Sequence, residues 1–353
     1  MDVIDYTNRS ITVKQVADFS NLSTATVSRV LNGARNVRPA TRQRVLEAVQ
    51  ALGYTGNHAA RALRSRRTNT FGVIFPYIAS GFFSEVLIGM NEVASQRGIH
   101  LNVGFAHGEH DQEQLVSQYL QDGRVDALLL MNLSMPEAFI EQMVQSGTPI
   151  VLLDRPAASA AVPSVVVDNV GGAKAAMRHL LACGHERIAV IRGPQASFDS
   201  QQRLVGCWAA LTAAQRELEP DLLWAGDFTE PSGQAAVSAW LEAGRELPDA
   251  IFALNDTMAL GVRAVLDAAG IRIPEDVALV GFDDVEPARH VGLTTVRSPM
   301  MEMGRTALRM AVAAAEGEGE GTAGRPAAHQ VLDTELIVRQ TCGWRHRQGP
   351  ADG

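Results

Sequence analysis

Apolar residues at helical spacing predict two short helices joined by a tight turn between residues 13 and 31. Thr12 can cap the first helix, because Gln15 follows three residues later and completes a capping box. Ser23 is the cap candidate of the second helix. The apolar positions expected to pack the two helices together are Val13, Val16, Ala17, Val27, Val30 and Leu31.

The opposite side of the second helix carries the short polar or basic residues Thr24, Ala25, Ser28 and Arg29. A helix that buries one face and offers hydroxyl groups and an arginine on the other is typical of DNA recognition helices. The alternative is an ordinary solvated amphipathic helix pair. A third helix is predicted directly afterwards, from a proline start to a glycine stop. Its first-turn residue, core positions and stop are Pro39, Val45, Leu46, Val49, Leu52 and Gly53.

From residue 71 onwards, short apolar runs alternate with helix-like stretches. Runs such as 71–75, 127–131 and 150–153 are typical of buried parallel strands. The alternation predicts an α/β body, and the strands are too many for one small sheet, which favours two doubly wound parallel-sheet lobes. The end of the body is expected to hold a helix over 300–316 and, after a Gly/Glu-rich loop, one last strand over 331–338.

Charge separates the head from the body. The whole chain carries a formal net charge of −8, but residues 1–67 hold eleven Lys or Arg against four acids, a net of +7. The remainder is therefore at −15. A basic head on an acidic body indicates a protein that binds nucleic acid through one end.

Composition excludes several other classes of protein. At 353 residues, with 46% apolar and 20% charged residues, the chain is an ordinary soluble globular protein of more than one domain. No basic segment followed by an apolar run opens the chain, and no stretch has the length of a membrane span, so no membrane partner is expected. Cys183, Cys207 and Cys342 are odd in number and widely spaced, which predicts buried thiols in a reducing cytoplasm.

Catalytic and metal-binding motifs are missing. The sequence has no G-x-S-x-G, no P-loop and no G-x-G-x-x-G after a strand, so an enzyme is not expected. The polar group His107, Glu109, His110 and Asp111 is interpreted as a solvated turn, and neither a cofactor nor a metal is expected.

Residues 57–65 can form one further short helix between the head and the body. Arg61, Arg64, Arg66 and Arg67 make this segment basic, and it has too little apolar surface to fold alone. It is predicted to become ordered on DNA; a plain flexible linker is the equally plausible alternative.

The stretch TVKQVADFSNLSTATVSRVLNG, followed by VRPATRQRVLEAVQALGY and NHAARALRS, resembles the DNA-binding part of the LacI/GalR family of bacterial transcriptional regulators. VVVDNVGG, CGHERIAVIRGP, FALNDTMALG and IPEDVALVGFDD resemble further landmarks of the same family. The resemblance covers nearly the whole chain. It implies a homodimer whose two heads bind successive major grooves of a palindromic double-stranded DNA operator.

The resemblance also implies domain bounds. The body is similar to periplasmic sugar-binding proteins, in which the chain crosses between the lobes three times, here near Val167, near Val296 and near the loop at Arg325. The expected parts are a helix-turn-helix domain (1–56), a hinge helix and linker (57–70), a two-lobed effector and dimerisation domain (71–341) and a disordered tail (342–353). The first lobe is expected at about 71–167 and 297–326, and the second at about 168–296 and 327–341.

Specific roles in DNA binding follow from the resemblance alone. Thr24 and Ala25 are expected to contact base edges, with support from Arg29, while Leu63 inserts into the minor groove and kinks the duplex. Gly56 stands where the family usually has proline. Phosphate and hinge contacts are expected from Ser23, Thr26, Ser28, Asn32, Asn57 and Ala60.

The effector site is expected at the carboxyl ends of the strands, where open α/β sheets bind ligands. Asp154, Asn255 and Asp283 each follow or end a predicted strand. The resemblance assigns Arg203, Phe228, Asn255 and Asp283 to the effector, and Phe82 and Phe83 are candidates in the other lobe. The alternatives are that the aspartates are helix caps, that Phe83 belongs to the core, and that Arg203 and Asp283 form an ion pair between the lobes.

The predicted function is a repressor released from its operator by a small carbohydrate. Vicinal hydroxyls suit Arg and Asp, which can each bind two neighbouring oxygens. A corepressor-activated or dual regulator that responds to a nucleoside or a sugar phosphate is the alternative, and a secreted solute-binding protein is the least favoured. A purine effector ranks low, because the purine-responding branch has arginine at the position of Ser197.

Overall fold

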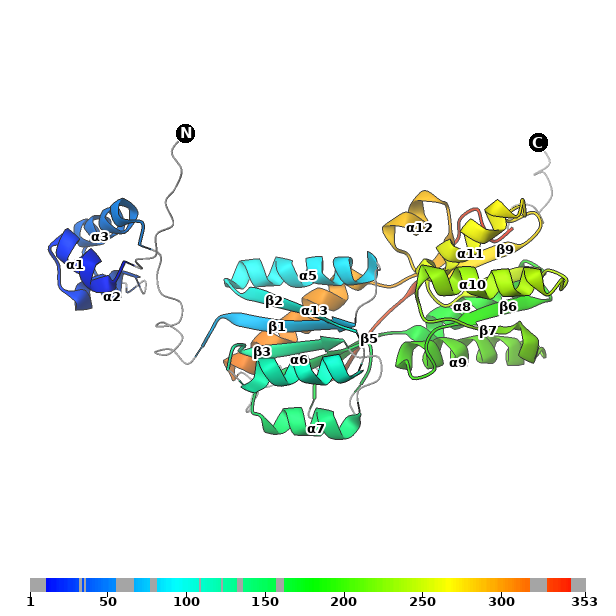
Figure 1. The fold of residues 1–353 in the computed structure, drawn as a ribbon, viewed down its shortest axis with the longest axis horizontal. Helices are drawn as coiled ribbons and strands as arrows, with labels where there is room; N and C mark the ends of the chain where they lie inside the picture. The colour runs from blue at the N-terminus through cyan, green and yellow to red at the C-terminus, as the bar shows by residue number, and fades with distance from the viewer. Residues whose placement is uncertain are drawn as a thin grey trace. The chain divides into compact units, whose positions relative to one another are not determined.

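The computed structural model describes residues 11–31, 34, 36–54, 67–76, 81–107, 109–121, 123–131, 136–156, 162–317 and 329–343. These residues form two compact units, one within 1–68 and one within 69–353 (Figure 1). The hinge helix expected over 57–65 lies outside the described residues.

The head consists of three helices: α1 (Val13–Ser20), α2 (Thr24–Leu31) and α3 (Pro39–Leu52). The capping box predicted at the start of α1 is present: the Thr12 amide donates to Gln15 Oε1 at 2.8 Å, and the Gln15 amide donates to Thr12 Oγ1 at 3.3 Å. The core joins one face of each helix through Val16, Ala17, Val27, Val30, Val45 and Ala48.

One predicted core position of the head is wrong. Leu46 is 48% exposed, and Ala48 is buried in its place. Along α3, positions 45, 48, 49 and 52 share one face at helical spacing, whereas position 46 is rotated by about 100° from Val45. An apolar residue next to a core position was therefore assigned to the wrong face.

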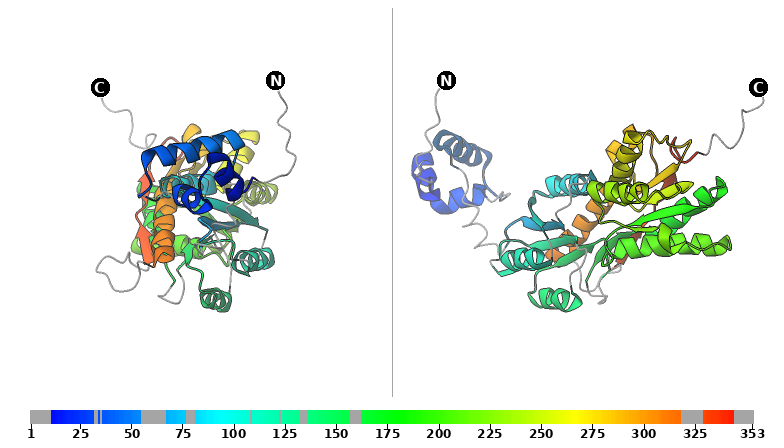
Figure 2. Two further views of the ribbon diagram at one scale, coloured as in Figure 1. Left: turned by 90° about the vertical axis from the view of Figure 1, so that its left-hand side faces the viewer. Right: turned by 45° about the vertical axis from the view of Figure 1, so that its right-hand side comes forward.

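The first lobe of the body is a parallel sheet in the order β11-β5-β4-β3-β1-β2. α5 (Gly81–Arg97) and α13 (Met300–Glu316) pack together on one face, and α6 (Glu109–Gln121) and α7 (Glu137–Gln145) cover the other (Figure 1; Figure 2). Alternate strand residues, such as Leu128 and Leu129, enter the clusters on opposite faces. The strands are β1 (Thr70–Pro76), β2 (His100–Ala106), β3 (Ala127–Met131), β4 (Ile150–Leu153), β5 (Ser164–Val167) and β11 (His329–Leu332).

The second lobe repeats this plan in the order β12-β10-β9-β8-β6-β7, with only β12 antiparallel to its neighbour. Its strands are β6 (Ile188–Arg192), β7 (Leu223–Ala225), β8 (Ala250–Ala253), β9 (Ala278–Asp283), β10 (Thr294–Arg297) and β12 (Glu335–Ile337). Its helices are α8 (Asn169–Ala182), α9 (Phe198–Ala213), α10 (Glu230–Glu242), α11 (Asp256–Ala268), the short α12 (Glu286–His290) and the 3₁₀ turn η1 (Pro220–Leu222). The predicted fold class, a helical head with two parallel-sheet α/β lobes, is confirmed.

The end of the chain differs from the expectation. The single strand expected over 331–338 is two strands, because β11 pairs with β5 of the first lobe and β12 pairs with β10 of the second. The third crossing therefore falls at Asp333–Thr334, not near Arg325, and residues 329–332 belong to the first lobe. Cys342, expected in a disordered tail, is fully buried. Residues 344–353 lie outside the described residues.

Two negative findings apply to the described part of the chain. None of its helices is both long and apolar enough to cross a membrane. It also holds no group of three or more His, Cys, Asp or Glu side chains that could bind a metal ion.

Candidate functional site

The candidate DNA-reading surface is the outer face of α2. Thr24, Ala25 and Arg29 are exposed there, while Val27 and Val30 on the opposite face are buried in the head. The arrangement matches a helix that is held by its apolar side and free to contact DNA with its polar side. Thr26 and Ser28 are half-buried, and Asn32, Asn57, Ala60 and Leu63 lie outside the described residues.

Ser23 stabilises the start of α2, in addition to its predicted phosphate contact. Its hydroxyl accepts a hydrogen bond from the Thr26 amide at 3.2 Å and lies 2.9 Å from the Thr26 hydroxyl. Ser23 is therefore the cap that starts α2, as its position in the sequence predicts. A substitution at Ser23 would disturb the helix as well as any phosphate contact.

Replacing Arg29 by alanine is expected to relax base discrimination at one operator position by ~1–3 kcal/mol, because the exposed guanidinium would no longer reach a base edge. The head should remain folded, since Arg29 lies outside its core. Binding to single-base operator variants, followed by fluorescence anisotropy at constant salt, measures the change. An unaltered preference at every position would refute the role of Arg29.

The candidate effector site gathers side chains from the carboxyl ends of both sheets. Asp154 follows β4 of the first lobe, while Asp283 ends β9 and Asn255 caps α11 in the second. Arg203 lies in the second turn of α9. All four are at least 93% buried. Asp154 lies close enough to Arg203 and Asp283 for their charges to shift the pKa of its carboxyl. The site therefore spans both lobes.

Arg203 is held in place on every side. Its Nε donates to Asn169 Oδ1 at 2.8 Å, one terminal nitrogen donates to the Leu254 carbonyl at 2.5 Å, and the other lies 3.3 Å from Asp283 Oδ1. The guanidinium also stacks 3.8 Å from the centre of the Phe282 ring. Arg203 and Asp283 do form an ion pair, but both belong to the second lobe, so the alternative of a pair between the lobes is wrong.

Asp199 and Asn169 were not predicted from the sequence. Asp199 is 6% exposed and accepts a hydrogen bond from Asn169 Nδ2 at 2.7 Å, while the carbonyl of the same amide binds Arg203. The available signal was spacing, since Asp199 precedes Arg203 by four residues and so shares its helix face. Asn169 had no such signal, because it lies 30 residues from Asp199 along the chain.

Phe228 is fixed by Asn255 at the edge of the site. Its backbone is left-handed, with φ of 70°, and its carbonyl accepts from Asn255 Nδ2 at 2.9 Å. Asn255 Oδ1 accepts from the Met258 amide at 2.9 Å and so caps α11. The Phe228 ring lies against Gly193, where a Cβ would come within 2.2 Å of it. Asn255 therefore orients Phe228 as well as capping a helix.

The two aromatic candidates of the first lobe lie in one aromatic cluster. Phe82, 8% exposed, packs edge-on against Phe83 with ring centres 5.6 Å apart, and Phe83 is 5.4 Å from Phe75. Phe83 is half-buried, so it packs on the core and keeps one exposed side. An effector role for either ring stays a prediction.

Burial raises the pKa of all three site carboxyls, because each loses water around its charged form. The pKa of Asp283 rises to about 7 and that of Asp199 to about 6, while that of Asp154 lies well above its usual value. The Arg203 charge opposes each rise without cancelling it. Near neutral pH the site therefore holds at least one carboxyl that can exchange a proton.

Replacing Asp199 by asparagine is expected to stabilise the body by about 3 kcal/mol at pH 8 and by only about 1 kcal/mol at pH 4.5. The folded pKa, about 6, exceeds the ordinary 3.8, so the folded state binds more protons between these values. Wild-type stability is thus lost as pH rises through this window, whereas asparagine carries no charge to bury. Thermal melting of both proteins across this range tests the difference, and an equal gain at both pH values would contradict it.

Asp283 presents an unsatisfied oxygen. Its Oδ1 is buried and accepts no hydrogen bond from any described residue, although it lies near Arg203. Its backbone has φ of 116°, and that of the next residue, Asp284, has φ of 62°. Two consecutive left-handed residues other than glycine are strained, and such strain is maintained only where the surroundings enforce it. A buried acceptor that is ion-paired but accepts no hydrogen bond from the described residues is suited to a ligand hydroxyl.

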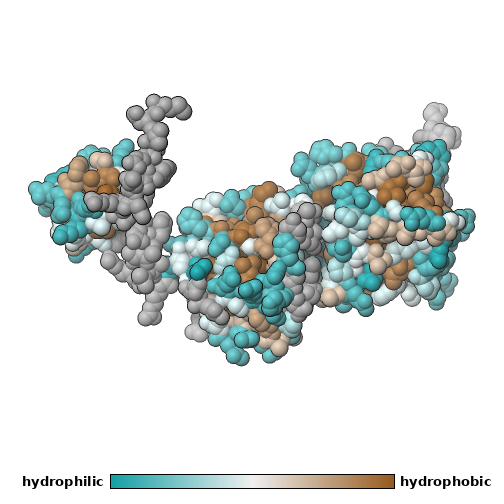
Figure 3. Space-filling view, in the orientation of Figure 1, coloured by the Kyte–Doolittle hydropathy of each residue, from teal (hydrophilic) through white to brown (hydrophobic). Residues whose placement is uncertain are grey.

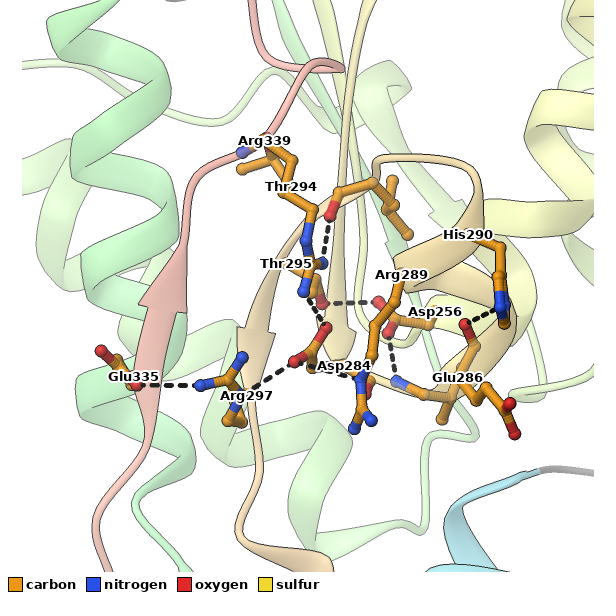
Figure 4. A network of polar contacts seen from close by, with 12 residues as sticks. Asp256, Asp284, Glu286, Arg289, His290, Thr294, Thr295, Arg297, Glu335 and Arg339 are labelled. Carbon is orange, nitrogen blue, oxygen red and sulfur yellow. Dashed lines mark hydrogen bonds and ion pairs between the residues drawn. The ribbon is translucent and has the colours of Figure 1, made fainter.

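Asp284, the second residue of this strained turn, interacts with three arginines (Figure 4). It is fully buried, and its carboxylate lies 2.8 Å from Arg297 Nε, 2.6 Å from Arg339 and 3.5 Å from Arg289. These arginines come from the end of β10, from the segment after β12 and from α12. Arg289 also pairs at 3.3 Å with Glu85 on α5, which carries the network into the first lobe.

Comparison with known proteins identifies both units. Residues 12–57 match the family described as bacterial regulatory proteins, lacI family, and residues 177–342 match the periplasmic binding protein-like domain. The HTH-type transcriptional regulator CelR of Thermobifida fusca is 36% identical over 94% of this chain and 98% of its own length. Catabolite control protein A of Priestia megaterium is 33% identical over 85% of this chain and 91% of its own.

Solved structures of transcriptional regulators are also similar to this chain. A complex of the transcriptional regulator CelR with cellobiose is 35% identical, with a TM-score of 0.70, and covers 94% of this chain and 99% of its own. A lac repressor dimer bound to operator and the anti-inducer ONPF has a TM-score of 0.82 at 27% identity, covering 95% of this chain and 99% of its own. The predicted resemblance is confirmed. The chain belongs to the lacI family of bacterial regulatory proteins and is a DNA-binding transcriptional regulator.

Proposed function

We propose that this regulator is a repressor that leaves a palindromic operator when a small carbohydrate binds between its lobes. The observation that carries the proposal is the buried Oδ1 of Asp283 at the carboxyl end of β9, which is ion-paired with Arg203 but accepts no hydrogen bond from the described residues. CelR, the relative with bound cellobiose, supports a carbohydrate as the class of ligand. The contacts would come from Asp154, Arg203, Phe228, Asn255 and Asp283, with Phe82 and Phe83 in the first lobe.

The proposed mechanism couples lobe closure to DNA release. Asp154 and Asp283 come from different lobes, so a ligand that binds both draws the lobes together. Closure shifts the dimer contact of the first lobe and melts the hinge segment, which releases the operator. Linkage requires that effector and operator weaken each other by the same factor.

A homodimer is part of the proposal. Ile88 on α5 is 51% exposed and Phe105 on β2 is 52% exposed. Apolar residues gather on the surface around α5 and β2 of the first lobe (Figure 3). An exposed apolar patch of this kind suits a protein contact. Two heads held together would read the two halves of a palindrome, and sedimentation equilibrium of the full chain is expected to give twice the chain mass.

The function is tested with DNA and ligand together. Full-length protein is used to select duplexes from a random pool, and the enriched duplex is then titrated with carbohydrates. We expect an enriched palindrome and its release by one carbohydrate class. Tighter operator binding in the presence of the ligand would indicate a corepressor-activated repressor and not an induced one. A pool in which no duplex is enriched would refute sequence-specific binding. We expect no catalytic turnover of the ligand, and we place the protein in the cytoplasm, where the operator is.

A further inference from the structure

The effector site contains more acidic than basic groups. Asp154, Asp199 and Asp283 are 7%, 6% and 4% exposed, and Arg203 is the cation that acts on all three. Fully ionised, this group of four carries a net charge of −2. Water, which would otherwise screen the excess charge, has little access to it.

Arg203 has little capacity left for an anionic ligand. Its Nε and one terminal nitrogen donate to protein oxygens, and its other terminal nitrogen faces Asp283 at 3.3 Å. One face of the guanidinium is covered by Phe282. A bidentate arginine contact, the usual way to bind a carboxylate or a phosphate, would first have to break these interactions.

The cation next to Asp154 is also engaged by an acid. Arg155, next to Asp154, pairs with Glu137 at 2.8 Å, and Arg192, at the end of β6, has one terminal nitrogen bound to the Gly193 carbonyl at 3.1 Å while its charge is not neutralised by that contact. The stretches 77–80, 132–135 and 157–161, which lie outside the described residues, contain no lysine, arginine or histidine in the sequence. They cannot supply the missing positive charge.

We propose that this site selects an uncharged, hydroxyl-bearing carbohydrate and rejects its carboxylate and phosphate counterparts. The inference rests on the proposed function, because it assumes that this cluster contacts the effector. Hydroxyl groups can donate to carboxylates and accept from protonated ones, so a neutral sugar satisfies the cluster in either state. An acidic group would add a like charge to buried carboxylates whose neighbouring cation, Arg203, is already ion-paired with one of them.

The raised pKa of Asp283, about 7, agrees with this selectivity. A neutral ligand leaves the carboxyl free to keep or lose its proton. An anionic ligand would force further protonation before it could bind, which lowers its affinity at neutral pH. The same cluster thus discriminates by charge even where the sugar rings are identical.

The test compares matched ligands on the full-length protein by calorimetry and thermal shift. The neutral members are cellobiose, glucose, galactose and ribose, and their acidic counterparts are cellobiose 6-phosphate, glucuronic acid and glucose 6-phosphate, galacturonic acid, and ribose 5-phosphate. We expect at least one neutral sugar to bind and its acidic counterpart to bind at least tenfold more weakly. An acidic sugar that binds as tightly as its neutral counterpart would overturn the selectivity and leave the regulator proposal intact. No binding by any member would instead overturn the carbohydrate proposal itself, and this inference with it.

A charge-removing variant separates charge from shape. Asp199→Asn keeps the size and the acceptor for Asn169, and we expect it to narrow the neutral-to-acidic affinity ratio at least tenfold. Glu217→Gln removes one charge from an exposed position after α9 and should leave the ratio unchanged. If Asp199→Asn is not folded by circular dichroism, Asp154→Asn makes the same change from the other lobe. An unchanged ratio in a folded site variant would overturn the proposal.

Discussion

Replacing Asp283 by asparagine is expected to weaken effector binding about 100-fold and to leave operator affinity within about twofold. The Asp283 Oδ1 is ion-paired with Arg203 at 3.3 Å but accepts no hydrogen bond from the described residues, so it can still accept one from a ligand hydroxyl. Two charge-assisted hydrogen bonds lost together correspond to ~3 kcal/mol. The head is a separate compact unit, so its fold does not depend on this residue.

The measurement is operator release followed by fluorescence anisotropy at increasing effector concentration, with the ligand found in the matched panel. Glu217→Gln is the matched control, because it makes the same chemical change at an exposed position outside the site. Release at the wild-type effector concentration would eliminate Asp283 as a ligand contact. Loss of operator binding without effector would show that Asp283 holds the repressing conformation instead.

Local signals made much of the fold predictable. The capping box of Thr12 and Gln15 and the cap at Ser23 depend on residues three positions apart, so the sequence displays them directly. The alternation of apolar runs with helical stretches is also visible in short windows of the sequence, so it predicted the two lobes. Asp154, Asn255 and Asp283 could be proposed because each follows or ends an apolar strand.

The rest depends on contacts that only the folded chain creates. Asn169 meets Asp199 and Arg203 because two helix starts lie side by side at the sheet end, although they are far apart in sequence. The split of the last strand is set by its partners, since β11 pairs with β5 and β12 with β10. The stretch 331–338 is apolar at both ends and polar at Asp333 and Thr334, and the sequence alone does not show whether these two residues belong to one strand or separate two strands that join different sheets. The sequence likewise does not show that the guanidinium nitrogens of Arg203 are already bound to protein oxygens, because those partners are far away along the chain.

Replacing Asp284 by alanine is expected to destabilise the body by about 2–4 kcal/mol and to weaken effector binding as well. The fully buried carboxylate joins Arg289, Arg297 and Arg339, and its loss leaves their positive charges facing one another. Removing one partner of a buried ion pair typically costs about 3–5 kcal/mol. The expected loss is smaller here, because the side chains of Arg289 and Arg297 are 44% and 46% exposed and can be rehydrated.

Urea denaturation and effector titration of the same variant distinguish a structural from a positioning role. Glu335→Gln is the control, because it removes an exposed partner of Arg297 at 3.4 Å and leaves Asp284 in place, so it should change stability by less than about 1 kcal/mol. The conservative variant Asp284→Asn keeps the shape of the turn and should retain more effector affinity than alanine. If Asp284→Ala lowers stability but binds effector as the wild type does, the strained turn at Asp283 keeps its conformation without Asp284. The three arginines would then contribute to stability and not to effector binding. If both fall together, the arginine cluster sets the direction of the Asp283 carboxylate and connects it, through Arg289 and Glu85, to the first lobe.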